Sequence, residues 1–198
     1  MTPTAVMFED WSQFYVLTGT AAATLIGLLF VVSTLTTNFE SDKARRGTSV
    51  FMSPIVFHLT GVLILSIYSL VPRLNEPDFA HGALLIATVG LIWAVRVAVG
   101  ITRPINPGDF DWSDFGWYGV VPALVYLAQC AISLRLVLDY PTPPHWFGGL
   151  IVAMLALSIR NAWDLVTFIA QMPESSAPAK EIEKGEKERE GKDEKSPR

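Results

Sequence analysis

The chain has 198 residues, of which 51% are hydrophobic and 17% are charged, and its formal net charge at pH 7 is −4. This charge balance provides no basic field on which nucleic acid could condense, so we expect no nucleic-acid partner. The single cysteine, Cys130, excludes an intramolecular disulfide and any metal site built from several cysteines.

The first predicted element is a membrane-spanning helix over residues 11–37. The uncharged run that contains it, residues 11–39, is longer than the ~20 residues needed to cross about 30 Å of hydrocarbon. A secretory signal is not expected, because Glu9 and Asp10 precede the run in place of basic residues and because the run exceeds a signal core of roughly 7 to 15 residues. We therefore expect this helix to stay in the mature protein.

Small residues recur every four positions along this first helix, at Gly19, Ala23 and Gly27. Small side chains on one helical face let another backbone approach closely inside a membrane. The three residues are therefore predicted to form a helix-packing face. Its partner is either another helix of the same subunit, which the needs of a small bundle favour, or a second copy in a dimer or ring.

Three further spans follow in chain order. They are predicted over 49–72, 80–102 and 115–138. The second span lies between Arg46 and Arg73 and contains Pro54, which we expect to kink it. The third and fourth spans each carry one arginine near an end, Arg96 and Arg135, whose long side chains can snorkel to the membrane surface.

The fifth span is predicted over 146–172. A cluster of prolines forbids a helix before about Trp146, and Arg160 ends the apolar run. The roughly 14 residues between them reach only ~21 Å as a helix, which is too short to cross the hydrocarbon. The helix must therefore continue and carry Arg160, Asn161 and Asp164 into the membrane.

The distribution of basic residues predicts the orientation of these spans. Lys43, Arg45 and Arg46 share the first loop, which the positive-inside rule places in the cytoplasm. The predicted fold is therefore an all-α integral membrane bundle of about five transmembrane helices, residues 1–172, with its N-terminus outside and its C-terminus cytoplasmic. Residues 173–198 alternate Lys and Glu and contain almost nothing apolar, so we expect a charged, disordered cytoplasmic tail.

Four polar residues at membrane depth are predicted to form one buried cluster. They are His58, Arg160, Asn161 and Asp164. Counted from the expected inner ends of their helices, His58 lies ~13 Å deep, Asp164 ~12 Å and Arg160 ~18 Å. The cluster has two interpretations: a structural group in which Arg160 and Asp164 neutralise each other, or a titrating site in which protonation of His58 changes its attraction to Asp164.

The sequence contains no recognisable catalytic or metal motif. There is no HExxH, GxSxG, P-loop or GxGxxG pattern, so we expect no enzymatic activity, no catalytic residues and no cofactor. Asp109, Asp111 and Asp114 crowd the third loop, yet they lack the glycine and terminal glutamate of a calcium loop. No metal is assigned to them.

Two apolar stretches carry a family resemblance. FYVLTGTAAATLIGLLFVVSTL at residues 14–35 and SPIVFHLTGVLILS at residues 53–66 resemble a family of small bacterial multi-pass membrane proteins to which no function is assigned. The likeness covers about the first third of the chain. It implies a location in the bacterial inner membrane and implies no activity.

Two functions remain open at this point. The small-residue face and the charged tail favour a non-enzymatic scaffold, accessory or regulatory protein, whose partners are the lipid bilayer and a second copy or another membrane protein. The ionisable residues at membrane depth favour the alternative, an oligomeric channel or transporter for a proton, ion or small solute. The absence of an internal repeat in the sequence lowers the case for a conventional transporter.

Overall fold

The computed structural model describes residues 10–36, 42–102 and 112–170, and the regular elements in this part of the chain are all helical. The elements are α2 (Ser12–Thr36), α3 (Asp42–Ser69), α4 (Glu76–Ile101), α5 (Trp112–Asp114), η1 (Phe115–Val120), α6 (Val121–Val137) and α7 (Pro144–Ala170). η1 is one wide π-helical stretch that runs directly into α6, so the two form a single rod.

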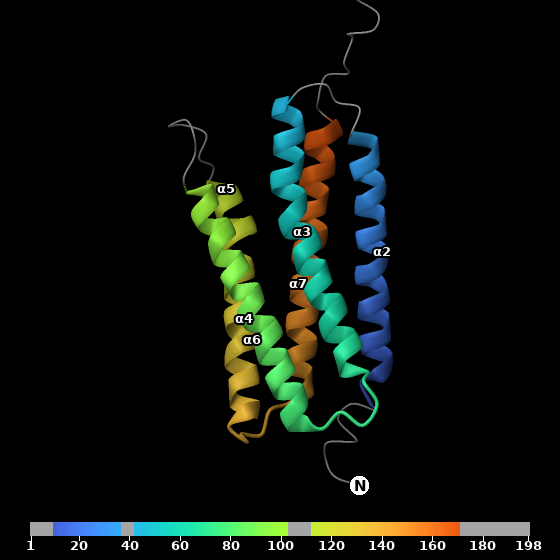
Figure 1. Ribbon diagram of the computed structural model, residues 1–198, viewed down its shortest axis with the longest axis vertical. Helices are drawn as coiled ribbons and strands as arrows, with labels where there is room; N and C mark the ends of the chain where they lie inside the picture. The colour runs from blue at the N-terminus through green and yellow to red at the C-terminus, as the bar shows by residue number, and fades with distance from the viewer. Residues whose placement is uncertain (1–9, 37–41, 103–111, 171–198) are drawn as a thin grey trace, which may run out of the picture.

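The long helices alternate in direction along the chain (Figure 1). The C-terminal ends of α2, α4 and α7 therefore lie at one end of the bundle, together with α5 and η1. α2 packs mainly along α3, and α4 packs mainly along α6 and η1. α7 joins the two pairs, because it contacts α3, α6 and α2.

Within the residues that the structure describes, five segments are long and apolar enough to cross a membrane. They are Ser12–Thr34, Met52–Ser69, Glu76–Ile101, Phe115–Val137 and Pro144–Thr167. The prediction of an all-α chain with five such helices is confirmed. Its orientation remains a prediction, and the tail at 173–198 lies outside the described residues.

Three of the long helices begin earlier than the sequence predicts. α7 starts at Pro144 in place of 146, because proline is tolerated at the first helical position. α3 starts at Asp42, seven residues before the expected 49, because its polar first turns are helical as well. α4 starts at Glu76 in place of 80. There the Asn75 side chain caps the helix by accepting a hydrogen bond from the backbone N–H of Asp78 at 2.8 Å.

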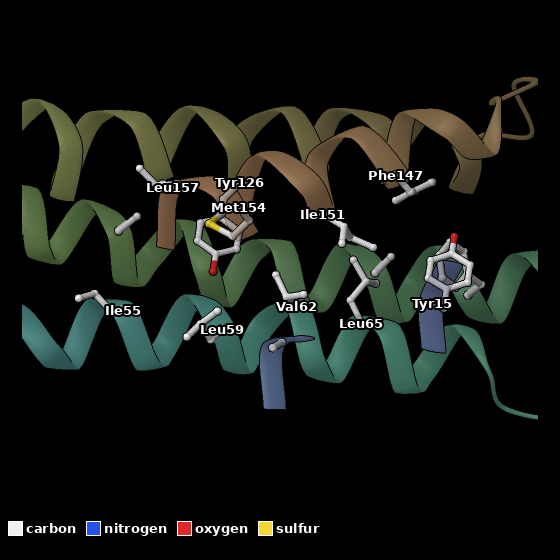
Figure 2. Close-up of a cluster of buried hydrophobic side chains, with 14 of the residues drawn as sticks. Tyr15, Ile55, Leu59, Val62, Leu65, Tyr126, Phe147, Ile151, Met154 and Leu157 are labelled. Atoms are coloured by element: carbon white, nitrogen blue, oxygen red, sulfur yellow. The ribbon is translucent and has the colours of Figure 1, made fainter. Parts of the chain in front are cut away.

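The core takes buried apolar side chains from all five long helices (Figure 2). α4 contributes a ridge of alanines and one glycine at helical spacing, which lets α6 come close. The outward faces are also apolar: Leu17, Phe30 and Leu85 are each about two-thirds exposed. A water-soluble bundle would place polar residues there, so this exterior fits a hydrocarbon surrounding.

Candidate functional site

The small-residue face of α2 divides between the inside and the outside of the chain. Gly19 is buried, and a Cβ built on it would lie 3.1 Å from Cβ of Ser66 on α3. The neighbouring Thr18 and Ser66 hydroxyls are hydrogen-bonded at 3.1 Å. Gly19 therefore marks a close approach of α2 to α3, which is the same-subunit contact that the sequence favoured.

Ala23 and Gly27 face away from the rest of the chain. Both are exposed, and a Cβ built on Gly27 would meet nothing within 4 Å. The reason is geometric: residues four apart on an α-helix are offset by about 40°, so Gly27 is turned about 80° from Gly19. Packing within the subunit explains the small residue at Gly19 and does not explain those at Ala23 and Gly27.

His58 is fully buried, and its side chain is bonded to a residue that the sequence did not single out. Its Nδ1 lies 3.1 Å from the hydroxyl of Tyr126 on α6. Figure 2 shows the Tyr126 ring directed from α6 toward α3, level with Leu59. The hydroxyl lies 3.2 Å from where a Cβ of Gly61 would be, so this glycine leaves room for it on α3.

Gly90 of α4 makes the position of Tyr126 feasible. A Cβ built on Gly90 would overlap the Tyr126 ring. The ring can therefore pack against α4 at this position only because Gly90 has no side chain. Tyr126 itself is 2% exposed. Helices α3, α4 and α6 therefore meet at Tyr126. We call this tyrosine and its hydrogen-bond partner the His58–Tyr126 pair.

Several buried polar atoms inside the bundle have no hydrogen-bond partner within the described parts of the chain. They are Nε2 of His58, Nε1 of Trp93, Nε2 of Gln129, Oγ of Ser133 and Oγ of Ser158. Polar atoms without hydrogen-bond partners in an apolar interior cost free energy. Each of them therefore needs an explanation, such as a bound water, a ligand or a functional role.

Arg160, Asn161 and Asp164 form a separate group where α7 meets η1. Arg160 Nη1 lies 2.8 Å from Asp164 Oδ2 and donates to Asn161 Oδ1 at 3.2 Å. The guanidinium also stacks over the ring of Trp117, 4.1 Å from its centroid. Asn161 is buried and donates to the Trp117 carbonyl at 3.4 Å, which ties α7 to the π-helical stretch.

His58 does not join this group, so the expected single cluster is two. A similar depth on two helices brings side chains together only if both face the same neighbour. The Nδ1 of His58 is bonded to Tyr126 on α6, whereas Arg160 lies over Trp117 of η1.

Arg160 and Asp164 are partly exposed, with side-chain exposures of 34% and 40%. Their ion pair spans one helical turn of α7 and lies beside Trp117 of η1, the stretch that directly follows α5. This arrangement suits a structural pair, because the guanidinium is neutralised by Asp164 and stacked on Trp117.

No group of three or more His, Cys, Asp or Glu that could hold a metal ion occurs among the residues the structure describes. Asp109 and Asp111 lie outside those residues, and so does the side chain of Asp114.

Comparison of the chain with protein-family models, curated proteins and solved structures gives no match.

Proposed function

We propose that this chain is a multi-pass protein of the bacterial inner membrane that acts without catalysis, as a scaffold or accessory protein that binds a partner inside the bilayer. Five helices of sufficient length and an apolar exterior support the insertion. Lys43, Arg45 and Arg46, which were expected in the first loop and lie in the first turns of α3, support an external N-terminus and a cytoplasmic C-terminus.

The open face of α2 carries this proposal. α2 lies at the edge of the bundle (Figure 1), and its exposed side presents Thr20, Ala23, Thr24 and Gly27. The Thr24 hydroxyl donates a hydrogen bond to the Thr20 carbonyl oxygen at 2.9 Å, so this hydroxyl is satisfied within its own helix. The backbone of α2 is therefore accessible to a second helix over two turns, and the proposed partner is a second copy of the chain.

Leucine substitutions at Gly19 and Ala23 should separate folding from association. Ala23→Leu is expected to weaken the dimer at least about tenfold, the equivalent of about 1.4 kcal/mol, because the larger side chain holds the two backbones apart. It should leave the melting temperature unchanged, because Ala23 is exposed. Gly19→Leu should lower the melting temperature, because it meets Ser66.

The measurement is cross-linking and sedimentation of the purified protein in detergent, alongside thermal unfolding. Ala131→Leu is the matched control, since Ala131 is an exposed alanine on another span, α6. If Ala23→Leu and Ala131→Leu have the same effect on oligomer size, the open face of α2 contacts lipid alone.

A second candidate function has its own observation. The unpartnered polar atoms of His58, Gln129, Ser133 and Ser158 lie inside the bundle, where water or a passing ion would satisfy them. Proton or ion flux into liposomes that depends on His58 would favour a channel or transporter over a scaffold.

A further inference from the structure

An apolar groove of about 440 Å³ runs between α4 and the rod formed by η1 and α6. Leu91, Val95 and Val99 line it from α4, and Phe115, Ala123 and Leu127 line it from the other side. With the exception of Thr102 at one end, every residue that lines the groove has a hydrocarbon side chain or is a glycine. The groove is open to the outside of the bundle, since Val95, Val99 and Leu127 are each 42–53% exposed.

Small residues shape the floor of this groove. A Cβ built on Gly119 of η1 would lie 2.8 Å from Cβ of Ala98, so the two helices touch there almost backbone to backbone. Larger side chains stand on either side of this contact and form the walls. The wide π-helical turn supplies Gly119 and Phe115 to the same face, and such turns recur at binding sites.

The length of the groove matches one leaflet of a bilayer. It extends along α4 from Leu91 to Thr102, which are eleven residues and about 16 Å apart. Half of a hydrocarbon core of about 30 Å is about 15 Å. The groove therefore starts near the middle of α4 and ends at the C-terminal end of this helix. An acyl chain of a lipid in that leaflet covers the same range of depth. A transmembrane helix of a partner protein would need a groove about twice as long.

A cation flanks the groove. Arg96 is exposed, directly follows Val95, and lies three residues before Val99 on the same helix. The one ion pair among the described residues joins Arg160 to Asp164, so no carboxylate in this part of the chain neutralises Arg96. An arginine this close to the end of an apolar span extends to the headgroup region, where anionic phosphate is the available partner.

We propose that the groove and Arg96 together bind one anionic phospholipid of the leaflet that faces the C-terminal end of α4, with an acyl chain in the groove and the phosphate on the guanidinium. The site rests on the membrane insertion proposed above and is independent of the α2 contact. In the proposed orientation this leaflet is the cytoplasmic one, which is the leaflet with the negative surface potential.

Lipid retention by the full-length protein tests the site. The protein is extracted from nanodiscs that contain equal amounts of phosphatidylglycerol and phosphatidylcholine, and the lipids it retains are counted by native mass spectrometry. The wild type should retain one phosphatidylglycerol in preference to phosphatidylcholine. Arg96→Gln should remove that preference, because the variant lacks the charge that holds the phosphate. Arg135→Gln is the control, since that guanidinium lies over the rings of Tyr140 and Trp146 near the other end of the bundle.

Ala123→Phe should fill the groove and lower retention of either lipid at least about tenfold, whereas Ala131→Phe, on the exposed side of the same helix, should not. Val99→Phe fills the groove from α4 and replaces Ala123→Phe if that variant melts early. Unchanged lipid preference in Arg96→Gln, or equal retention by the filled and control variants, overturns the lipid site. A cross-link between two copies through Val99 would assign the groove to a partner helix and would equally overturn it. Loss of association with nanodiscs by the wild type would instead refute the membrane insertion itself.

Discussion

Gly90→Ala is expected to destabilise the bundle by about 1–3 kcal/mol, through the addition of one methyl group. The methyl group would overlap the ring of Tyr126, and the packing around the ring leaves it no free space to move into. Tyr126 is 2% exposed, and its hydroxyl is held at His58 beside Gly61. Relief would require α4 and α6, the most extensively packed pair in the fold, to move apart.

Gly100→Ala is the matched control on the same helix. A Cβ at Gly100 meets no atom of the described residues within 4 Å, so this variant should unfold at the wild-type midpoint or slightly above it. The measurement is thermal or denaturant unfolding in one detergent for all three proteins. Equal midpoints for the two glycine variants would show that α4 and α6 are not packed through Tyr126.

Tyr126→Phe is expected to cost about 1–3 kcal/mol, although it removes a single oxygen atom. His58 is fully buried, and its Nδ1 is bonded to the hydroxyl that the variant lacks. Its Nε2 already has no hydrogen-bond partner among the described residues. Both ring nitrogens would then be buried and unsatisfied, so the variant bears the desolvation penalty of the imidazole without compensation.

A second substitution should restore much of that loss. Replacing both partners of a buried hydrogen bond by apolar groups can be nearly neutral, so His58→Leu with Tyr126→Phe is expected to be more stable than Tyr126→Phe alone. Unfolding of the two single variants and the double variant measures this coupling. Additive losses would show that the imidazole and the phenol do not interact.

The sequence predicted the helices well and their axial positions poorly. Uncharged runs identify five long helices because a charge inside hydrocarbon is costly, and this signal needs no tertiary information. The start of α3 was predicted seven residues too late. That helix extends through charged residues from Asp42, which hydropathy alone assigns to a loop.

The contacts between helices were predicted in part. Gly19 packs against Ser66 within the subunit, but the rotation of α2 that exposes Ala23 and Gly27 follows from the packing of all five helices. Tyr126 was missed because a tyrosine in an apolar run gives no local sign of its partner. The signal was the pair of glycines, Gly61 and Gly90, on two other helices, and only their meeting in space explains it.

Both proposed binding surfaces require a chain that crosses the membrane five times and ends in the cytoplasm. A reporter fused after Ser196 measures this directly, with a second reporter inserted after Pro72, in the turn between α3 and α4, as an internal reference. An odd number of spans and the basic residues at the start of α3 predict a cytoplasmic signal after Ser196 and an external signal after Pro72. An external signal after Ser196 would contradict the five-span arrangement.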